Sequence, residues 1–558
     1  MGVVYTKPWV VDLILDLAGY VERRDLARVH AVEPSAGTGA FLIPMARRLL
    51  ASAHRHRRRL ADLHASLRAY ELDEYSAEVA SDLLVAEMRA WGATSGQARR
   101  LADGWLVVDD YLTASPGAVP ADVVAGNPPY VRYDDVPNPL LTAYRRLYPT
   151  MVGRGDVYVG FIEAALRQLK PQGVLGFICA DRWMRSAYGV ELRRLIGETY
   201  CVDTVIEMHR APAFEEAVAA YPAVMIVRRA RQRDVIVASA GPDARALPDH
   251  ASLANAVVQL ADKRVRAVPG FSATRLPHWF VGGDPWPALP PRQFHLLQRL
   301  TEAGRPLEDA ATGTKIGIGV ATGADKVFVT TDPDIVEPDR LLPLALASDT
   351  KSGRVQWSRH YLIDPWLSTG QLVDLRDYPK LRSYFARHRA QLERRNIAQR
   401  SGGDWYRTID RVQHGLTSQP KLYFPDMRLV SNPTLDGGGT YPHHNLYFLV
   451  SSAWDLEVLG GLLLSRLAQV FIEAYCVKMR GGTLRFQAQY LRRIRVPAVE
   501  SMADEVCDRL RYAFRNRDID LATQAAAEAY GLPECPRELL DALVCVAPAV
   551  LQEQHDEW

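Results

Sequence analysis

The residues of this sequence with the clearest chemistry form the run Ala125-Gly126-Asn127-Pro128-Pro129-Tyr130-Val131. Its two prolines fix the backbone and lack N–H donors, so the carbonyl oxygens can point at a ligand. The Asn127 amide oxygen and the Pro128 carbonyl could both accept hydrogen bonds from an amino group. Such acceptors would help an unreactive aromatic amine, because they stabilise the positive charge that grows on its nitrogen during methyl transfer. Tyr130 offers a face on which a planar base can stack.

A second candidate site lies upstream, in the run Val32-Glu33-Pro34-Ser35-Ala36-Gly37-Thr38-Gly39. An apolar run precedes it and a helical pattern follows it, which predicts a turn between a strand and a helix. Gly37 and Gly39 permit tight backbone geometry and let a ligand approach the main chain. The turn lacks the third glycine of the dinucleotide-binding fingerprint.

Two further strand ends carry carboxylates. Glu71 ends the next apolar run, where an acidic side chain could hold ribose hydroxyls. Asp110 follows the third run and precedes Tyr111, whose ring could face an adenine. A glycine turn, a carboxylate, and a carboxylate with an aromatic therefore follow three successive strands. This order predicts a site for a nucleoside cofactor.

The elements that must position these residues alternate between strand and helix. Apolar runs predict strands at 29–33, 67–71, 106–109, 122–125, 174–179, 202–206 and 223–227, with helices between them, as at 39–50, 76–91 and 158–169. This alternation predicts a parallel sheet that binds its ligand at the carboxyl ends of its strands. A chain of 558 residues is too long for one ordinary core. We expect a catalytic domain over 1–235, a connecting helical segment over 236–310, a second domain over 311–500 and a helical segment over 501–558.

In this order, the motifs resemble the gamma-type amino-methyltransferases of bacterial restriction–modification and related defence systems. The resemblance covers essentially the whole sequence. It implies an α/β fold: a class I Rossmann-like methyltransferase sheet with helices on both faces, followed by a mixed α+β target-recognition domain. It also implies methyl transfer from S-adenosylmethionine, without a metal, to the N6 amino group of an adenine flipped out of double-stranded DNA.

The resemblance also assigns roles to single residues. The cofactor site comprises Thr6, Glu33, Pro34, Gly37, Gly39, Glu71, Asp110 and Tyr111. Within it, the glycine turn cradles the methionine part, Glu71 takes the ribose, and Asp110 and Tyr111 contact the adenine. Thr6 lies near the methionine carboxylate, although Lys7 stands where many members have proline.

The catalytic residues implied by the resemblance are Asn127, Pro128, Tyr130 and Phe214. Asn127 and Pro128 bind the target amino group, and Tyr130 stacks on one face of the flipped base. Family members place an aromatic residue for the opposite face shortly after the sixth strand. The matching run here is His209-Arg210-Ala211-Pro212-Ala213-Phe214, which gives Phe214 this role; a phenylalanine of the hydrophobic core is the alternative interpretation.

Nucleic-acid binding must come from local basic clusters, because the net charge is only +2. Residues 376–411 contain ten Lys or Arg against four Asp or Glu, and residues 478–495 contain six Lys or Arg and no acid. Such clusters suit phosphate contacts. Looser matches to family recognition domains occur at 315–323, 405–406 and 480–483. A cognate restriction endonuclease or another defence-system protein is a further expected partner.

The cysteines and the hydropathy indicate a compartment. The six cysteines are scattered without a C-x-x-C pair, which argues against a zinc site and a disulfide framework. Neither a membrane-spanning apolar run nor a secretory signal is evident, so we expect a soluble protein of the bacterial cytoplasm or nucleoid that contacts no membrane.

Several alternatives share parts of this pattern. Cytosine-N4 or RNA amino-methylation would use the same pocket chemistry. Release-factor glutamine methyltransferases also carry Asn-Pro-Pro-Tyr, but they are much shorter and lack a large basic C-terminal domain. Pro338-Asp339 followed by Asp349-Thr350-Lys351 formally fits a sparse nuclease pattern, as expected of a bifunctional restriction enzyme. A DNA-binding module with an inactive catalytic fold is the last alternative.

Overall fold

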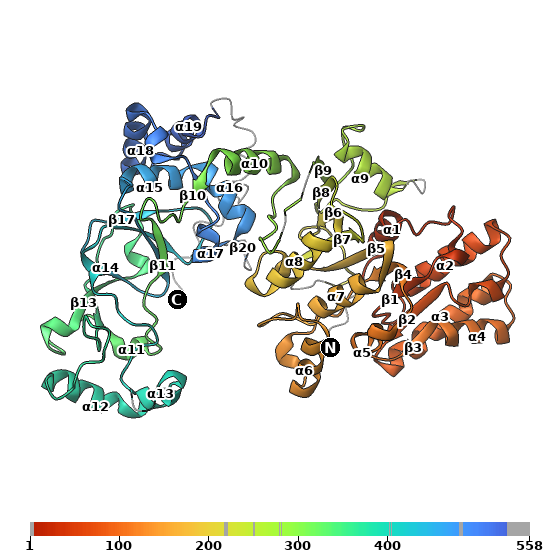
Figure 1. The fold of residues 1–558 in the computed structure, drawn as a ribbon, viewed down its shortest axis with the longest axis horizontal. Helices are drawn as coiled ribbons and strands as arrows, with labels where there is room; N and C mark the ends of the chain where they lie inside the picture. The colour runs from red at the N-terminus through yellow and green to blue at the C-terminus, as the bar shows by residue number, and fades with distance from the viewer. Residues whose placement is uncertain are drawn as a thin grey trace. The chain divides into compact units, whose positions relative to one another are not determined.

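The computed structural model describes residues 5–216, 221–248, 252–277, 279–280, 282–400, 402, 404–478 and 484–532. It divides into two compact units, unit 1 (Met1–Arg292) and unit 2 (Gln293–Trp558) (Figure 1).

Within the described part of unit 1, the strands form one nine-stranded sheet in the order β3-β2-β1-β4-β5-β7-β6-β8-β9. The strands are β1 (Ala31–Glu33), β2 (Leu67–Glu71), β3 (Leu106–Val108), β4 (Ala121–Gly126), β5 (Leu169–Ala180), β6 (Cys201–Glu207), β7 (Pro222–Arg228), β8 (Val235–Ala240) and β9 (Phe271–Leu276). Neighbouring strands from β3 to β5 are parallel, β7 is antiparallel to both β5 and β6, and β9 is antiparallel to β8. The carboxyl ends of β1 to β4 therefore meet at one edge of the sheet, where the predicted motifs lie.

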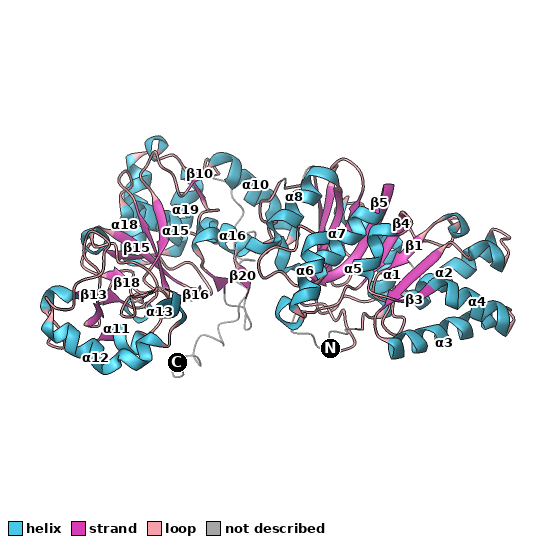
Figure 2. Ribbon diagram, turned by 60° about the horizontal axis from the view of Figure 1, so that its bottom comes forward, coloured by secondary structure: helices cyan, strands magenta, loops and turns pink. Residues whose placement is uncertain are grey.

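Helices cover both faces of this sheet (Figures 1 and 2). One face shares a hydrophobic core with α1 (Pro8–Leu17), α2 (Leu42–Arg55), α3 (Glu74–Ala90), α4 (Ser95–Trp105) and α9 (Leu253–Ala261). The other elements near the site are α5 (Tyr111–Ala114), α6 (Asn138–Leu147), α7 (Tyr158–Gln168) and α8 (Val190–Thr199). Central strands such as β7 are buried almost throughout, as expected for a sheet covered on both sides.

The seven predicted strands are all present, but the catalytic sheet does not end at the predicted boundary at residue 235. Strands β8 and β9 and helix α9 fall in the segment that we expected to be a helical connection, and they extend the sheet beyond β6. In β9 buried and part-exposed residues do not alternate regularly, so the strand has no period-2 signal. This part of the prediction is wrong because pairing with β8, and not local pattern, makes the strand.

Helix α2 stops within the basic run at 54–59. Helix α2 ends at Arg55, because Arg57 adopts a left-handed conformation with φ of 55°. The Arg58 N–H then donates to the Ala53 carbonyl at 2.8 Å, which closes the last turn.

Unit 2 combines small sheets with helices. Its described strands form the sheets β11-β19-β15-β17, β12-β14-β13-β18, β16-β21-β20 and β10-β22. Their bounds are β10 (Arg305–Pro306), β11 (Lys315–Ile318), β12 (Val329–Thr330), β13 (Leu341–Ala345), β14 (His360–Ile363), β15 (Lys421–Pro425), β16 (Met427–Arg428), β17 (Thr434–Asp436), β18 (Tyr441–Pro442), β19 (Leu446–Val450), β20 (Val477–Lys478), β21 (Leu484–Arg485) and β22 (Arg495–Val496).

The helices of unit 2 are α10 (Phe294–Ala303), α11 (Asp325–Phe328), α12 (Pro379–Glu393), α13 (Asn396–Arg400), α14 (Gly415–Ser418), α15 (Leu456–Leu464), α16 (Arg466–Tyr475), α17 (Ala488–Leu491), α18 (Asp504–Asn516) and α19 (Ile519–Ala529). Helices α18 and α19 lie in the segment predicted to be helical from residue 501; its part after residue 532 lies outside the described residues. No single described helix is long and apolar enough to cross a membrane, and only the bent pair α15–α16 passes that test by length and composition.

Candidate active site

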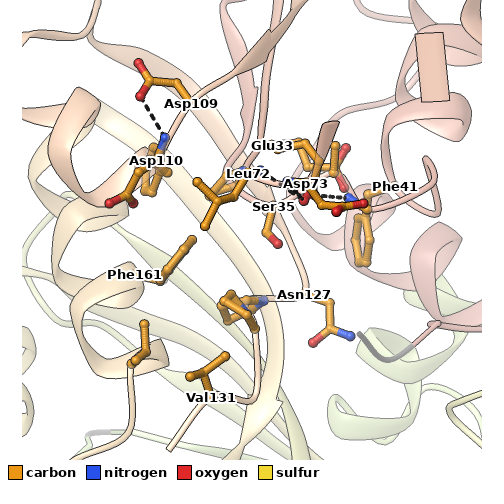
Figure 3. A pocket seen from close by; sticks show the side chains of 18 of the residues that line it. Glu33, Ser35, Phe41, Leu72, Asp73, Asp109, Asp110, Asn127, Val131 and Phe161 are labelled. Carbon is orange, nitrogen blue, oxygen red and sulfur yellow. Dashed lines mark hydrogen bonds between the residues drawn. The ribbon is translucent and has the colours of Figure 1, made fainter. Parts of the chain in front are cut away.

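A cavity of about 520 Å³ opens at the carboxyl ends of β1 to β4 (Figure 3). Nine of the twelve predicted site residues line it: Thr6, Glu33, Pro34, Gly37, Glu71, Asp110, Tyr111, Asn127 and Pro128. In Figure 3, Asp110, Leu72 and Phe161 gather toward one end of the cavity, and Glu33, Phe41 and Asn127 toward the other. The predicted residues Gly39, Tyr130 and Phe214 do not line this cavity.

Glu33 ends β1 and is almost completely buried, with 1% of its surface exposed. Its Oε2 atom has no hydrogen-bond partner among the described residues. Burial and the neighbouring Glu71 carboxylate raise the pKa of Glu33 well above its ordinary value, although the Phe41 N–H donates to it. A buried carboxyl with one unpartnered oxygen is costly for the folded chain, and such groups concentrate at functional sites.

Glu71 ends β2 and joins the glycine turn to the next helix. Its Oε2 accepts from the Gly37 N–H at 2.6 Å, and its Oε1 accepts from the backbone N–H groups of Leu72 and Asp73, both at 2.9 Å. Gly37 has φ of 53°, a conformation that other residues rarely adopt. The carboxylate is therefore held in a fixed position at the edge of the cavity.

Gly39 supports this turn from outside the cavity. Its φ is 103°, and a Cβ atom there would come within 2.9 Å of the Ile43 side chain. The Gly39 N–H donates to the Ala36 carbonyl at 2.9 Å, which tightens the turn. Gly39 thus shapes the loop that lines the cavity without lining it.

Asp110 and Tyr111 lie at the end of the cavity formed by β3. Asp110 caps α5 by accepting from the Leu112 N–H at 2.9 Å, and its other oxygen accepts from the Tyr144 hydroxyl at 2.7 Å. Tyr111 is almost fully buried, and its hydroxyl donates to Gln168 Oε1 at 2.8 Å. Its ring packs against Phe161, with 5.6 Å between the ring centroids. These rings form an apolar wall of the cavity.

Asn127 follows β4 at the other end of the cavity, and Thr6 orients its side chain. The Asn127 Nδ2 group donates to Thr6 Oγ1 at 3.2 Å. Thr6 is itself buried, and it forms a β-bridge with Phe214. Lys7 is the N-cap residue of α1, which begins at Pro8. Thr6 lines the cavity although position 7 is not a proline.

Tyr130 and Phe214 lie side by side next to this cavity. Their ring centroids are 6.4 Å apart and their planes are at 86°, so one ring presents its edge to the other. The Tyr130 hydroxyl is buried and has no hydrogen-bond partner within the described part of the chain. Burial, with smaller contributions from Cys179 and Asp181, raises the pKa of Tyr130 well above its ordinary value. The structure thus brings together the two aromatic residues selected from the sequence.

Sequence reasoning missed the part of the wall that follows the Asn-Pro-Pro-Tyr motif. Val136, Leu140 and Tyr144 all line the cavity, and the last two lie one turn apart on α6. Their spacing of four residues was an available signal, because such residues share one face of a helix. Tyr5, Ser35, Leu72, Asp73, Asp109 and Phe161 also line the cavity and were not predicted as site residues.

In unit 2 many of the predicted basic residues have internal partners. Arg395 donates to the carbonyls of Thr322, Trp405 and Arg407, each at 2.8 Å, so it holds a loop together. Arg492 pairs with Glu308. Arg382, Arg387 and Arg394 are exposed at α12 and its C-terminal end. The Arg480–Thr483 match lies outside the described residues.

The formal nuclease pattern has no exposed acidic pair. Asp349 is buried, and its carboxylate accepts from the Leu346 N–H at 3.0 Å. Asp339 is exposed in a short turn. The buried carboxylate serves the local fold, which does not support metal-dependent cleavage at this place.

Comparisons with known proteins agree with this site. A family model described as the Eco57I restriction-modification methylase matches residues 119–214. The chain is 41% identical to the type II methyltransferase M.PaeR7I of Pseudomonas aeruginosa, over 97% of this chain and 93% of that protein. It is 38% identical to the type II methyltransferase M.XhoI of Xanthomonas vasicola, over 97% and 98% of the two chains. The chain belongs to the type II methyltransferases of restriction–modification systems.

A solved structure supports the fold. The type IIL restriction-modification enzyme MmeI, determined in complex with DNA, matches with a TM-score of 0.56 at 11% identity, over 96% of this chain and 77% of that one. The predicted fold class, a methyltransferase α/β sheet with a second mixed domain, is confirmed.

S-adenosylmethionine is the cofactor expected of this family, and the residues of the cavity fit it. The unpartnered, buried Glu33 oxygen suits the positively charged methionine end, and the apolar wall of Tyr111 and Phe161 suits the adenine end. The fixed Glu71 carboxylate lies at the same cavity and suits the ribose hydroxyls.

Proposed function

We propose that this methyltransferase transfers a methyl group from S-adenosylmethionine to the N6 amino group of an adenine flipped out of duplex DNA. The observation that carries the proposal is the position of Asn127. Its amide, oriented by Thr6, and Pro128 line the same cavity as Glu33 and Glu71. An acceptor pair for an amine and a set of cofactor ligands thus share one pocket.

The chemistry follows from the two acceptors. S-adenosylmethionine, when bound, supplies an electrophilic methyl group on a sulfonium. The Asn127 amide oxygen and the Pro128 carbonyl accept the two N–H groups of the target amine. They stabilise the positive charge that grows on its nitrogen, and they do so in a fixed position because the proline-rich loop is rigid. The reaction therefore requires neither a covalent intermediate with the chain nor a metal.

The aromatic pair supplies the place for the base. A base inside a duplex is out of reach, so the enzyme must extrude it into a pocket. Tyr130 follows Asn127 in the same loop, and Phe214 pairs with Thr6, which contacts Asn127. The two rings touch edge to face, so a base that enters between them must part them. We infer that Tyr130 stacks on one face of the adenine and Phe214 contacts the other.

The remaining parts of the proposal concern partners. Unit 2 is the target-recognition domain, and the exposed Arg382, Arg387 and Arg394 are its candidate phosphate contacts. The enzyme acts in the bacterial cytoplasm or nucleoid, together with a cognate restriction endonuclease or another defence-system protein. Its family membership supports these assignments.

The experiment that tests the proposal identifies the methylated nucleoside. The purified chain is incubated with duplex DNA and isotopically labelled S-adenosylmethionine, and the DNA is digested to nucleosides for mass spectrometry. We expect label in N6-methyladenine. Label in N4-methylcytosine, or in RNA but not DNA, would instead support the corresponding alternative.

Two additions complete this test. Single-molecule sequencing of DNA from cells that express the chain locates the recognition site. Incubation with DNA and Mg²⁺ should leave the DNA intact, and clean cleavage would revive the bifunctional alternative.

A further inference from the structure

A largely buried group of charged side chains lies near Tyr130 and outside the cofactor cavity. Asp181 follows β5, Glu207 ends β6, and His209 lies two residues further on. The side chains of Asp181 and His209 are 4% and 5% exposed. Arg185 pairs with Asp181 at 2.7 Å and is also buried. Methyl transfer as described above uses none of these groups.

His209 lies between two carboxylates. Its Nε2 atom is 2.7 Å from Asp181 Oδ2, and its Nδ1 atom is 3.0 Å from Glu207 Oε1. A neutral imidazole carries one N–H group, so it can donate to only one of the two carboxylates. With both carboxylates ionised, both contacts are hydrogen bonds only when the ring is an imidazolium. The geometry thus favours a buried cation at this position.

The electrostatics of the cluster agree with this protonation state. Burial would lower the pKa of His209, but the hydrogen bonds to Asp181 and Glu207 raise it above its ordinary value. Burial would likewise raise the pKa of Asp181, but Arg185 and His209 lower it to about 2. Among the described residues, the groups that face His209 are Asp181, Glu207 and the Tyr221 ring, at 4.9 Å between centroids, with Arg185 behind Asp181.

The cluster joins two strands that do not touch. Strand β7 lies between β5 and β6 in the sheet, so the His209–Asp181 contact passes over the start of β7. At this start the Asp181 N–H donates to the Tyr221 carbonyl and the Met208 N–H donates to the Pro222 carbonyl, both at 2.9 Å. The contact therefore fixes the direction in which the chain leaves β6.

The same stretch of chain carries Phe214. The Ala211 N–H donates to the Met208 carbonyl at 3.1 Å, which closes a turn that contains His209. The Lys7 N–H then donates to the Ala213 carbonyl at 2.9 Å, and Phe214 bridges to Thr6. The segment 208–214 is thus held at one end by the His209–Asp181 contact and at the other by the pairing with Thr6 and Lys7. These two sets of contacts place the Phe214 ring next to Tyr130.

We propose that His209, held as an imidazolium between Asp181 and Glu207, is a positioning residue that sets Phe214 opposite Tyr130 and so shapes the slot for the flipped base. This inference rests on the proposed function. His209 touches neither cofactor nor base in this role, and it acts through the segment 208–214. Loss of its charge removes one of its two carboxylate contacts and loosens that segment.

The inference predicts a pH dependence. A histidine with a raised pKa keeps both contacts at low pH and loses one as the pH rises through its pKa in the folded protein. Base capture by the wild-type enzyme should therefore weaken on the alkaline side. Cofactor affinity should not show this ionisation.

The test uses the full chain and a duplex with 2-aminopurine at the target position, once the recognition site is mapped. We expect His209→Gln to weaken base capture about tenfold, the lower end for losing a charge-assisted hydrogen bond, and to abolish the alkaline decline. Its affinity for S-adenosylmethionine, measured by titration, should equal that of the wild type. His54→Gln, at an exposed position near the end of α2, is the matched control.

A second variant tests the idea if His209→Gln fails to fold. Glu207→Gln keeps the contact to Asp181 but removes one carboxylate, so the alkaline decline should move to lower pH. An unmoved decline in this variant, or wild-type base capture by His209→Gln, overturns the inference. If the wild type itself makes no N6-methyladenine, the proposed function fails, and that result is distinct from either variant's behaviour.

Discussion

The two ends of the site are built in different ways. At the cofactor end, Glu33 and Glu71 each end a strand and Asp110 lies two residues after one, and their carboxylates accept from backbone N–H groups. At the target end, three segments far apart in the sequence meet, carrying Thr6, Asn127 with Tyr130, and Phe214. Each part of the cofactor end therefore begins from a short strand-end motif, whereas the proposed slot for the base depends on contacts among three distant segments.

The largest expected effect separates the chemistry from cofactor binding. Asn127→Ala should lower the methylation rate at least ~100-fold, because it removes an acceptor that acts on the transition state. Cofactor affinity should change little, since the residues at the cofactor end remain. Single-turnover kinetics and cofactor titration measure the two quantities. Asn255→Ala, at an exposed position on α9, is the control, and near wild-type turnover of Asn127→Ala would refute the role.

The converse effect is expected at the cofactor end. Glu71→Ala should weaken S-adenosylmethionine binding roughly 10–100-fold, as expected for the loss of one hydrogen bond to a charged group. At saturating cofactor the methylation rate should approach that of the wild type. Isothermal titration and saturation kinetics check this. Equal affinity of variant and wild type would show that Glu71 serves only the Gly37 turn.

Removing the Tyr130 ring should affect only the binding of the flipped base. Tyr130→Ala should weaken the hold on the flipped base by ~1–3 kcal/mol if stacking is its main contribution. A 2-aminopurine substrate reports this as a smaller fluorescence rise. The exposed Tyr512→Ala in unit 2 provides the control. An unchanged fluorescence rise in Tyr130→Ala would argue against stacking.

The smallest effect concerns stability and pH. Because the pKa of Glu33 is raised in the folded chain, its protonated form stabilises the fold fully below its ordinary pKa, and this contribution is lost as the pH rises through the raised value. Glu33→Gln stays neutral, so without cofactor it should melt about 2–4 °C higher than the wild type above that pH. The two proteins should converge at low pH.

The exposed Glu78→Gln on α3 is the control for this measurement. Differential scanning calorimetry across the pH range provides the melting temperatures. A variant that melts below the wild type at neutral and alkaline pH would mean that Glu33 is a stabilising anion.

The strands that carry the motifs were predictable because each has its own signal. An apolar run followed by a glycine, a carboxylate or a proline pair marks a strand end, and parallel strands bring such ends to one edge. Strand β9 gave no such signal, because it depends on pairing with β8. The α6 wall was missed for a related reason: Leu140 and Tyr144 are ordinary helix residues until the fold places them over the cavity.

The basic clusters show what a charge count leaves open. The count suggested phosphate contacts from the cluster at 376–411, and within it Arg395 is committed to three backbone carbonyls of its own unit. A charge count registers the sign of a side chain and not its partner.

The sequence by itself determined the candidate groups: an Asn-Pro-Pro-Tyr loop after a strand, a glycine turn and two carboxylates at or just after strand ends. Only the tertiary structure decided how the proposed base slot is assembled. Thr6 reaches Asn127 and Phe214 reaches Tyr130 across separations that no local pattern spans. The reason is physical, since strand and turn signals arise from interactions between near neighbours, whereas the slot depends on contacts that form when distant segments pair.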